Sequence, residues 1–456
     1  MKRKLLMAVL AAVGLSVLLA APAGAQEAEA APATQYVLDN LWVFIAGVLV
    51  FLMQAGFAMV EAGMTRAKNV ANIMAKNFAD ACVGILSFFF VGYMIAYGGD
   101  GTIIGWGSDA FALSGVDLFG TGEGLTGATD FFFQSVFAAT AVTIASGAMA
   151  ERTKFTAYLF FAVLMTSIVY PVVVHWTWGG GLIAKIEIGD AVYSDFAGSG
   201  IVHLTGAVAA FVGASMLGAR IGKYDKDGNS RAIPGHNIAL AALGVFILWF
   251  GWFGFNPGSE LAADDLVPFI ALNTLLAAAA GGVAATALTW GKSGVPDVGM
   301  TGNGILGGLV GITAGAGALT PIGSVITGAI AGILVPLSVE FIDKKLKVDD
   351  PVGAVSVHGT AGVWGLLAVG LFAKYDDAFL GREDAGLFYG GGIEQLIVQL
   401  LMALIIIAFV AVASVIVFTI IKSTIGLRVS EEEEMAGLDV SEHGGSGYAV
   451  DSVVKG

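Results

Sequence analysis

Long apolar segments recur along the chain, separated by shorter polar ones. A helix needs about 20 mainly apolar residues to cross the roughly 30 Å hydrocarbon core of a bilayer. The segments are long enough for this, so the pattern predicts an all-α membrane protein with eleven transmembrane helices. The predicted spans are 38–60, 77–97, 128–149, 155–177, 197–219, 235–257, 267–289, 302–318, 321–341, 352–372 and 395–422.

The amino-terminal segment has a pattern typical of a cleavable signal peptide. Basic residues at positions 2–4 precede a short apolar run, which ends at an Ala-Gly-Ala sequence before Gln26. A first membrane anchor is the alternative, but the apolar run is short for a span. The predicted organisation is a signal peptide at 1–25, a membrane domain at 36–425 and a tail at 426–456.

The basic residues predict the orientation of the chain. Lys and Arg accumulate in cytoplasmic segments of membrane proteins. If the mature amino terminus lies outside, only Lys185, Lys374 and Arg382 fall in external segments. We therefore expect a multi-pass protein of the inner (plasma) membrane with a cytoplasmic tail. The predicted external loop 98–126 has acidic residues and no basic ones, so its field favours cations.

Composition agrees with this class of protein. Hydrophobic residues make up 57% of the chain and charged residues 13%, against about 25% in soluble proteins. The net charge of −14 argues against nucleic-acid binding. The single cysteine, Cys82, excludes an intramolecular disulfide and a Cys-based metal site, and we expect neither a metal nor a cofactor. Glycines in two spans predict close helix packing: Gly206, Gly213, Gly304, Gly307, Gly308 and Gly311.

Two spans begin with related sequences. The fifth opens with Asp195, seven residues and His203, and the tenth opens with Asp350, seven residues and His358. Both share Val-His-x-Thr. Spans one to five and six to ten would then be two copies of a unit with an odd number of crossings. The second copy must cross in the opposite sense, which predicts an inverted repeat.

The spacing within each copy places its histidine. Each Asp suits the N-cap of a helix, where a carboxylate accepts free backbone N–H groups. Eight residues correspond to about 12 Å of helix, so His203 and His358 reach the middle of the membrane from opposite faces. Each could merely bond to a neighbouring helix, but ionisable residues inside a membrane are functional candidates. His175 has no such counterpart and is interpreted as structural.

Several further motifs occur in the same chain. Tryptophan, glycine and paired acidic residues dominate them. They are Ala150-Glu-Arg152, Trp178-Gly-Gly-Gly181, Asp195-Phe-Ala-Gly198, Gly251-Trp-Phe-Gly-Phe-Asn-Pro-Gly-Ser259, Asp349-Asp350-Pro351 and His358-Gly359.

Together with the two histidines, these motifs resemble the bacterial ammonium transporters of the Amt family, a sister group of the Rhesus proteins. The resemblance runs from about residue 36 to the tail. It implies eleven helices around a narrow pore in each subunit, a homotrimer embedded in membrane lipid, ammonium and methylammonium as substrates, and no enzymatic activity.

The resemblance also implies roles for individual residues. An external vestibule would bind ammonium, two stacked rings would close the pore beneath it, and a histidine pair would share a hydrogen bond below them. Trp252 and Gln134 also match family positions and are assigned no transport step. The vestibule residues are Phe137, Trp178 and Ser259, supported by Asp195; the gate is Phe137 and Phe255; the pore pair is His203 and His358.

Ammonium differs from K⁺ in one chemical respect that such a pore can use. It can release a proton and cross an apolar section as ammonia, whereas a bare cation there is costly. Histidine handles protons near neutral pH. Whether the proton follows, making transport electrogenic, is left open by the sequence. An ammonium sensor and a Rhesus-like gas channel are alternatives; Trp178 favours a cation over a gas.

The tail contains an acidic run, Glu431 to Glu434. Such runs are typical of solvated, disordered extensions. This one also resembles the family tail that contacts the cytoplasmic pore mouths and receives a PII-type regulatory protein. We therefore expect a regulatory tail.

Overall fold

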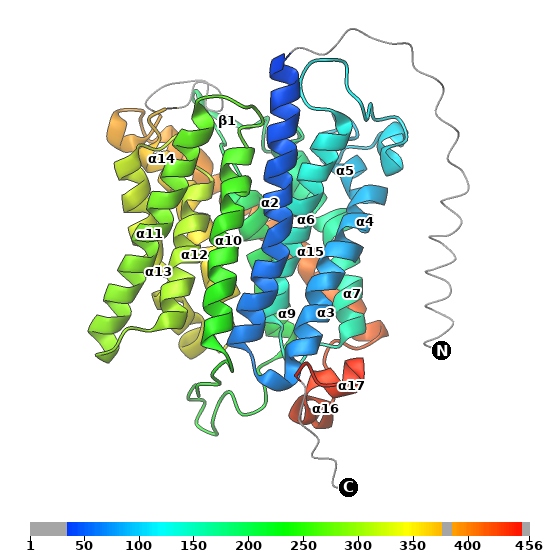
Figure 1. The fold of residues 1–456 in the computed structure, drawn as a ribbon, viewed down its shortest axis with the longest axis vertical. Coiled ribbons are helices and arrows are strands. Elements are labelled where there is room, and N and C mark those ends of the chain that lie inside the picture. Colours follow the sequence, from blue (N-terminus) through cyan, green and yellow to red (C-terminus); the bar gives the residue numbers. More distant parts are fainter. Residues whose placement is uncertain (1–33, 376–384, 449–456) are drawn as a thin grey trace. The chain divides into compact units, whose positions relative to one another are not determined.

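The computed structural model describes residues 34–375 and 385–448. The predicted signal peptide, residues 1–25, lies outside the described residues. Figure 1 shows long helices running side by side. Within the described ranges, ten helical segments are long and apolar enough to cross a membrane, and α12 (Val298–Thr313) is a shorter apolar helix of 16 residues. The all-α, multi-span prediction is confirmed.

The first half of the chain contains five membrane-crossing segments, several of them interrupted by π-helical turns. A two-stranded antiparallel ribbon lies between the fourth and the fifth, pairing Glu187 with Val192 and Ile188 with Ala191. The elements are α2 (Thr34–Met64), η2 (Ala67–Asn69), α3 (Val70–Ala79), η3 (Asp80–Gly84), α4 (Ile85–Ser87), η4 (Phe88–Gly92), α5 (Tyr93–Tyr97), η5 (Ser108–Leu113), α6 (Gly127–Ala148), α7 (Phe155–Leu164), η6 (Met165–Val169), α8 (Tyr170–Trp176), β1 (Glu187–Ile188), β2 (Ala191–Val192), η7 (Ser199–Leu204) and α9 (Thr205–Leu217).

The second half repeats the helical pattern and ends in a folded tail. Its segment that begins at Val355, like the one that begins at Ser199 in the first half, opens with a π-helical turn. The elements are α10 (Ile238–Gly258), α11 (Leu266–Ser293), α12, α13 (Pro321–Phe341), η8 (Ile342–Leu346), η9 (Val355–Thr360), α14 (Ala361–Phe372), η10 (Leu387–Tyr389), α15 (Glu394–Thr424), α16 (Glu431–Ala436) and α17 (Leu438–His443).

Polar caps fix where several of these helices begin. Side-chain oxygens of Ser, Thr, Asp and Asn satisfy backbone N–H groups that have no partner within the first helical turn. Such caps begin four of the long helices, which are α6 at Thr126, α10 at Asn237, α12 at Asp297 and α13 at Thr320.

The second crossing begins about ten residues earlier than predicted. We placed it at 77–97, but the helical segment runs over 67–97. Its first turns contain Asn69, Asn72 and Lys76, which are at most 1% exposed. Polar side chains made this stretch resemble a loop in sequence, whereas the protein buries them against other polar groups.

Glycines allow three helices of the second half to approach closely. A Cβ added at Gly304 or Gly308 of α12 would collide with the backbone of α11. Gly328 and Gly332 of α13 meet the same helix from another side. This agrees with the close packing predicted from the glycines of the eighth span.

Segments predicted to lie on the same side of the membrane do meet. We call the two ends of the bundle the inner end, predicted to be cytoplasmic, and the outer end. Alternation of the helices between these ends accounts for both sets of contacts. At the inner end Arg66 pairs with Glu151, Arg220 pairs with Asp349 and Lys68 donates to the Glu434 carbonyl. At the outer end Asn40 bonds to Gly124, Ala263 to Asp39 and Lys185 to Asp100.

The acidic run of the tail is helical where we considered disorder. Ser430 and Glu433 form a capping box at the start of α16: the Ser430 hydroxyl accepts from Glu433 N, and Glu433 Oε2 accepts from Ser430 N. Acidic residues in a first turn are also favourable next to the helix dipole. Glu434 and Leu438 are nearly inaccessible, so the tail packs against the inner end.

We predict that Gly308→Ala destabilises the protein. The added methyl would press on the Ala277 carbonyl of α11, and overpacking typically costs about 1–3 kcal/mol. Gly291→Ala is the matched control on α11, because a Cβ there meets no heavy atom within 4 Å. Thermal unfolding of the purified protein in detergent should give a lower Tm for Gly308→Ala alone; equal Tm values would contradict the packing.

Candidate functional site

The predicted histidine pair is present. His203 Nδ1 and His358 Nδ1 lie 3.1 Å apart, with ring centroids separated by 5.1 Å. Both residues are buried. The two histidines therefore contact each other inside the bundle, rather than bonding separately to neighbouring helices.

The pair shares one hydrogen. A neutral imidazole has one N–H donor and one bare nitrogen, so one Nδ1 must donate to the other. The ring that donates through Nδ1 has a bare Nε2, and its partner has a protonated Nε2. When the bare Nε2 gains a proton and the protonated Nε2 of the other ring loses one, the two rings exchange their donor and acceptor roles. The Nε2 atom of His203 is buried without a hydrogen-bond partner among the described residues.

Both histidines lie in π-helical turns. His203 belongs to η7 and His358 to η9, and each turn continues into an α-helix. Such turns are rare in proteins and are frequently found at functional sites. Nothing in the periodicity of the sequence indicated them.

The two aspartates cap these turns, as predicted. Asp350 accepts hydrogen bonds from the backbone of residues 352, 353 and 355. In both copies a glycine three residues after the aspartate adopts positive φ, Gly198 at 105° and Gly353 at 79°. The four donors to Asp195 are the backbone N–H groups of Gly198, Ser199, Gly200 and Ile201, at 2.7–3.1 Å.

Aromatic rings stack on the outer side of the pair. Phe137 and Phe255 are stacked, with centroids 4.1 Å apart, and both are buried. Trp178 meets Phe137 edge-on at 6.2 Å. Phe255 also stacks on His203 at 5.2 Å. The rings thus form a continuous column from Trp178 to the histidines.

The other residues that were predicted to form or support a vestibule lie next to this column. Ser259 Oγ donates to the Phe255 carbonyl at 2.8 Å, which leaves the lone pairs of Oγ available as acceptors. Trp178 Nε1 donates to the Asp195 carbonyl at 3.1 Å. Trp178 and Asp195 also line a cavity of about 90 Å³.

The other histidines have different surroundings. His175 faces two carbonyls, of Ala96 and Gly101, at 2.9 and 2.5 Å, in agreement with a structural role. His236 and His443 contact tail and inner-end residues. Within the described ranges no three His, Cys, Asp or Glu side chains could hold a metal ion.

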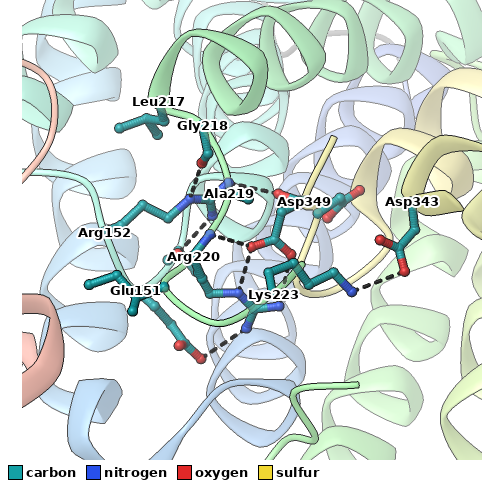
Figure 2. A network of polar contacts seen from close by, with 12 residues as sticks. Glu151, Arg152, Leu217, Gly218, Ala219, Arg220, Lys223, Asp343 and Asp349 are labelled. Carbon is teal, nitrogen blue, oxygen red and sulfur yellow. Dashed lines mark hydrogen bonds and ion pairs between the residues drawn. The ribbon is translucent and has the colours of Figure 1, made fainter. Parts of the chain in front are cut away.

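A buried ionic network joins the inner ends of several helices (Figure 2). Arg220 bonds to both oxygens of Asp349 at 2.8–3.0 Å and lies 3.3 Å from Glu151. Arg152 donates to the Asp349 carbonyl at 2.7 Å and to the Gly218 carbonyl. Asp349 precedes Asp350, so the network holds the cap of the His358 helix.

The pairing of opposite charges determines which side chains of this network are ionised. Burial opposes ionisation of Asp349, but the hydrogen bonds and charge of Arg220 lower its pKa to about 2. Burial alone would lower the pKa of Arg220, yet Asp349 and Glu151 raise it above its ordinary value. Both groups are therefore charged at neutral pH, and each would be left buried and unpaired without the other.

The sequence analysis missed several residues around the pair. Trp252, given no role, stacks on His203 at 5.2 Å and donates to Thr313 at 3.0 Å. The ring centroids of Phe57 and His358 lie 5.9 Å apart. Glu61, one turn after Phe57 on α2, is buried. Glu61 lay just beyond the predicted first span; a longer span would have marked it as a carboxylate inside the membrane.

Comparison with known proteins places these features in a family. Residues 41–448 match the Ammonium Transporter Family. "Ammonium transporter Amt2" of Archaeoglobus fulgidus is 47% identical over 428 residues, covering 90% of this chain and 88% of that protein.

Solved structures give the same result. One described as "Sensor Amt Protein" has a TM-score of 0.83 and 38% identity, covering 90% of this chain and 99% of that one. Mep2 of Candida albicans has a TM-score of 0.78 and 28% identity, covering 87% of each chain.

We predict that Asp195→Ala loosens the start of the His203 helix. Four buried N–H groups would lose their acceptor, and each unsatisfied buried group costs about 1–3 kcal/mol. Asp225→Ala is the control, since Asp225 also accepts from backbone N–H groups but lies in an exposed loop. Thermal unfolding should show a large loss of stability for Asp195→Ala and little for Asp225→Ala; similar losses would refute this role of the cap.

Proposed function

This chain belongs to the ammonium transporter family, and we propose that it moves ammonium by removing a proton, passing ammonia through a dry pore and carrying the proton along the histidine pair. The observation that carries the proposal is the 3.1 Å contact between His203 Nδ1 and His358 Nδ1 behind a column of stacked rings. The chain is a multi-pass membrane transporter and not an enzyme.

The outer end offers a place where ammonium would bind. Ring faces of Phe137 and Trp178 attract a partly desolvated cation by about 0.5–2 kcal/mol. The Ser259 hydroxyl, whose own hydrogen is directed to Phe255, can accept an N–H bond. The carboxylate of Asp195 supports this site through its negative charge and the cap that it forms, without touching the ion.

The stacked pair Phe137 and Phe255 would act as the gate beneath this site. An unpaired cation in apolar surroundings is costly, which excludes K⁺. Ammonium avoids this penalty by leaving its proton behind. The shared hydrogen of the histidine pair allows a proton to arrive at one Nε2 while another leaves at the opposite one, and this makes transport electrogenic.

The family resemblance extends the proposal to topology and assembly. We take α12 as an eleventh span, so that two inverted five-helix repeats are followed by one extra helix, and each subunit contains its own pore. The subunits would form a homotrimer in the inner (plasma) membrane, with the mature amino terminus outside and the carboxyl terminus in the cytoplasm.

Ammonium sensing is the second candidate, since one similar solved structure is described as a sensor. A sensor with this pore would bind ammonium with little or no flux. A Rhesus-like gas channel is the third, but the edge-on pair of Trp178 and Phe137 suits a cation better than a neutral gas. Flux and charge measured together in proteoliposomes separate the three.

We predict that the double substitution His203→Ala with His358→Ala abolishes selective ammonium transport, because no titratable pair remains in the pore. The measurement is ammonium-driven and K⁺-driven current in proteoliposomes, with His175→Gln as a buried-histidine control outside the pore. Retention of ammonium-selective current by the double variant would rule out the proton relay.

The tail is proposed as the docking and regulatory segment for a PII-type protein. Arg428 donates to the carbonyls of Leu217 and Ala219 and pairs with Glu434, and Glu434 accepts from Ile221 N at 2.7 Å. These contacts connect the tail to the end of α9, the helix that continues from His203.

We expect deletion of 427–456 to remove the response of ammonium flux to an added PII-type protein. Deletion of 445–456 alone is the control, because it keeps α16, α17 and the contacts of Arg428 and Glu434 with the end of α9 and with Ile221. Flux assays with and without the partner give the comparison. A full-length protein that ignores the partner, or a truncated one that still responds, would oppose this role.

A further inference from the structure

A small cavity lies directly beside the histidine pair. It has a volume of about 20 Å³ and is lined by His358, Phe57, Glu61 and Asn303, among others. A cavity needs about 10–15 Å³ to hold one water molecule. Ammonia is of similar size, so the space suits one small hydrogen-bonding molecule.

Glu61 brings a carboxylate into this cavity from within a membrane-crossing helix. Its Oε2 accepts from Ser146 Oγ at 2.8 Å and from Asn77 Nδ2 at 3.3 Å. Within the described part of the chain, Oε1 has no hydrogen bond. One oxygen thus holds the side chain in place, and the other is left for a molecule in the cavity.

A buried cation accompanies this carboxylate. Lys76 Nζ donates to the Ser146 carbonyl at 3.1 Å and lies 5.3 Å from the Tyr158 ring centroid. Lys76 is fully buried. It lies beyond ion-pair distance of Glu61, yet close enough through Ser146 to compensate its charge. A carboxylate inside a bilayer without such compensation would be very costly.

Asn303 is a second, independent indication of a ligand. Its Nδ2 donates to the Val352 carbonyl at 3.1 Å, whereas its Oδ1 is buried and has no hydrogen-bond partner among the residues that the structure describes. An unsatisfied buried acceptor beside a cavity requires a donor such as water, ammonia or ammonium. Asn303 and Val352 also line a larger cavity of about 520 Å³ at the inner end, so the small cavity lies between that space and the histidines.

We propose that Glu61 is the proton acceptor on the inner side of the histidine pair, and that the cavity it shares with Asn303 is the site where ammonia regains its proton. This inference rests on the proposed function and adds to it a named residue and site.

The proton transfers balance as follows. The His358 imidazolium loses its Nε2 proton, directly or through one water in the cavity, and the Glu61 carboxylate gains it as an O–H bond. Ammonia entering the cavity then takes that proton: the O–H bond breaks, an N–H bond forms, and ammonium and the carboxylate result. Asn303 Oδ1 accepts an N–H bond of the ammonium before it leaves toward the larger cavity.

The test is Glu61→Gln, which keeps the size of the side chain and an oxygen for Ser146 but cannot carry the proton. Proteoliposomes containing the full chain are given labelled methylammonium, and uptake and charge are measured together. The ratio of charge to methylammonium should fall at least tenfold, because the neutral amine can still cross while its proton cannot follow. Fewer folded molecules would lower both signals and leave the ratio unchanged.

Asp80→Asn is the matched control. Asp80 is equally buried and accepts a hydrogen bond from the Tyr158 hydroxyl at 2.7 Å, but it does not line the cavity. Its ratio should equal that of the unmodified protein. If Glu61→Gln does not fold, Glu61→Gln with Lys76→Gln removes both buried charges and should give the same low ratio.

The outcomes separate this inference from the proposed function. An unchanged ratio in the Glu61 variants, or an equal fall in Asp80→Asn, overturns the role of Glu61 while leaving ammonium transport intact. An unmodified protein with no methylammonium uptake overturns the proposed function itself. Uptake without charge overturns the proton relay and, with it, the role of Glu61.

Discussion

The meeting of two imidazole rings inside the bundle depends on two capping carboxylates. Asp195 and Asp350 each gather the free N–H groups at the start of a π-helical turn, and each is followed by a glycine with positive φ that permits the sharp bend. Each cap sets the depth and rotation of the helix behind it. The two helices start from opposite ends of the bundle. The depth and rotation of each therefore place His203 Nδ1 next to His358 Nδ1.

Hydrocarbon surroundings explain why so much of the polar chemistry is paired. Water is absent from the bilayer core, so each donor and acceptor there must be satisfied by the protein or by a small enclosed molecule. Arg152 and Arg220 meet this demand at the inner end with carbonyls and with Asp349. Glu61 and Lys76 meet it deeper in the bundle through Ser146. Among the buried polar atoms without a hydrogen-bond partner in the described residues are His203 Nε2 and Asn303 Oδ1, which lie along the proposed path of the substrate.

The sequence predicted the centre of this arrangement better than its surroundings. The Asp-to-His spacing predicted that His203 and His358 both lie near the middle of the membrane, because a cap and a helical rise fix the depth of a residue. Their direct contact was implied only by the family resemblance. The hydropathy pattern, by contrast, failed for Lys76. It placed Lys76 outside the second span because a charged residue is treated as a boundary. The π-helical turns were also unpredictable, since they arise from packing between helices. The tail shows a third case: four successive glutamates suggested disorder, but the capping box at Ser430 and burial of Leu438 fold them onto the inner end.

The shortness of α12 has an electrical consequence. At 16 residues it spans about 24 Å, less than the thickness of the hydrocarbon, and its first turns line the large inner cavity. Water in that cavity would conduct the potential inward, so the membrane voltage would fall across the remaining dry section instead of the whole bilayer. A charge that crosses only this section still experiences nearly the full potential, about 2.3 kcal/mol per 100 mV. The recess would therefore concentrate the electric field on the two imidazoles, where the electrical work done per ångström of proton displacement would be greatest.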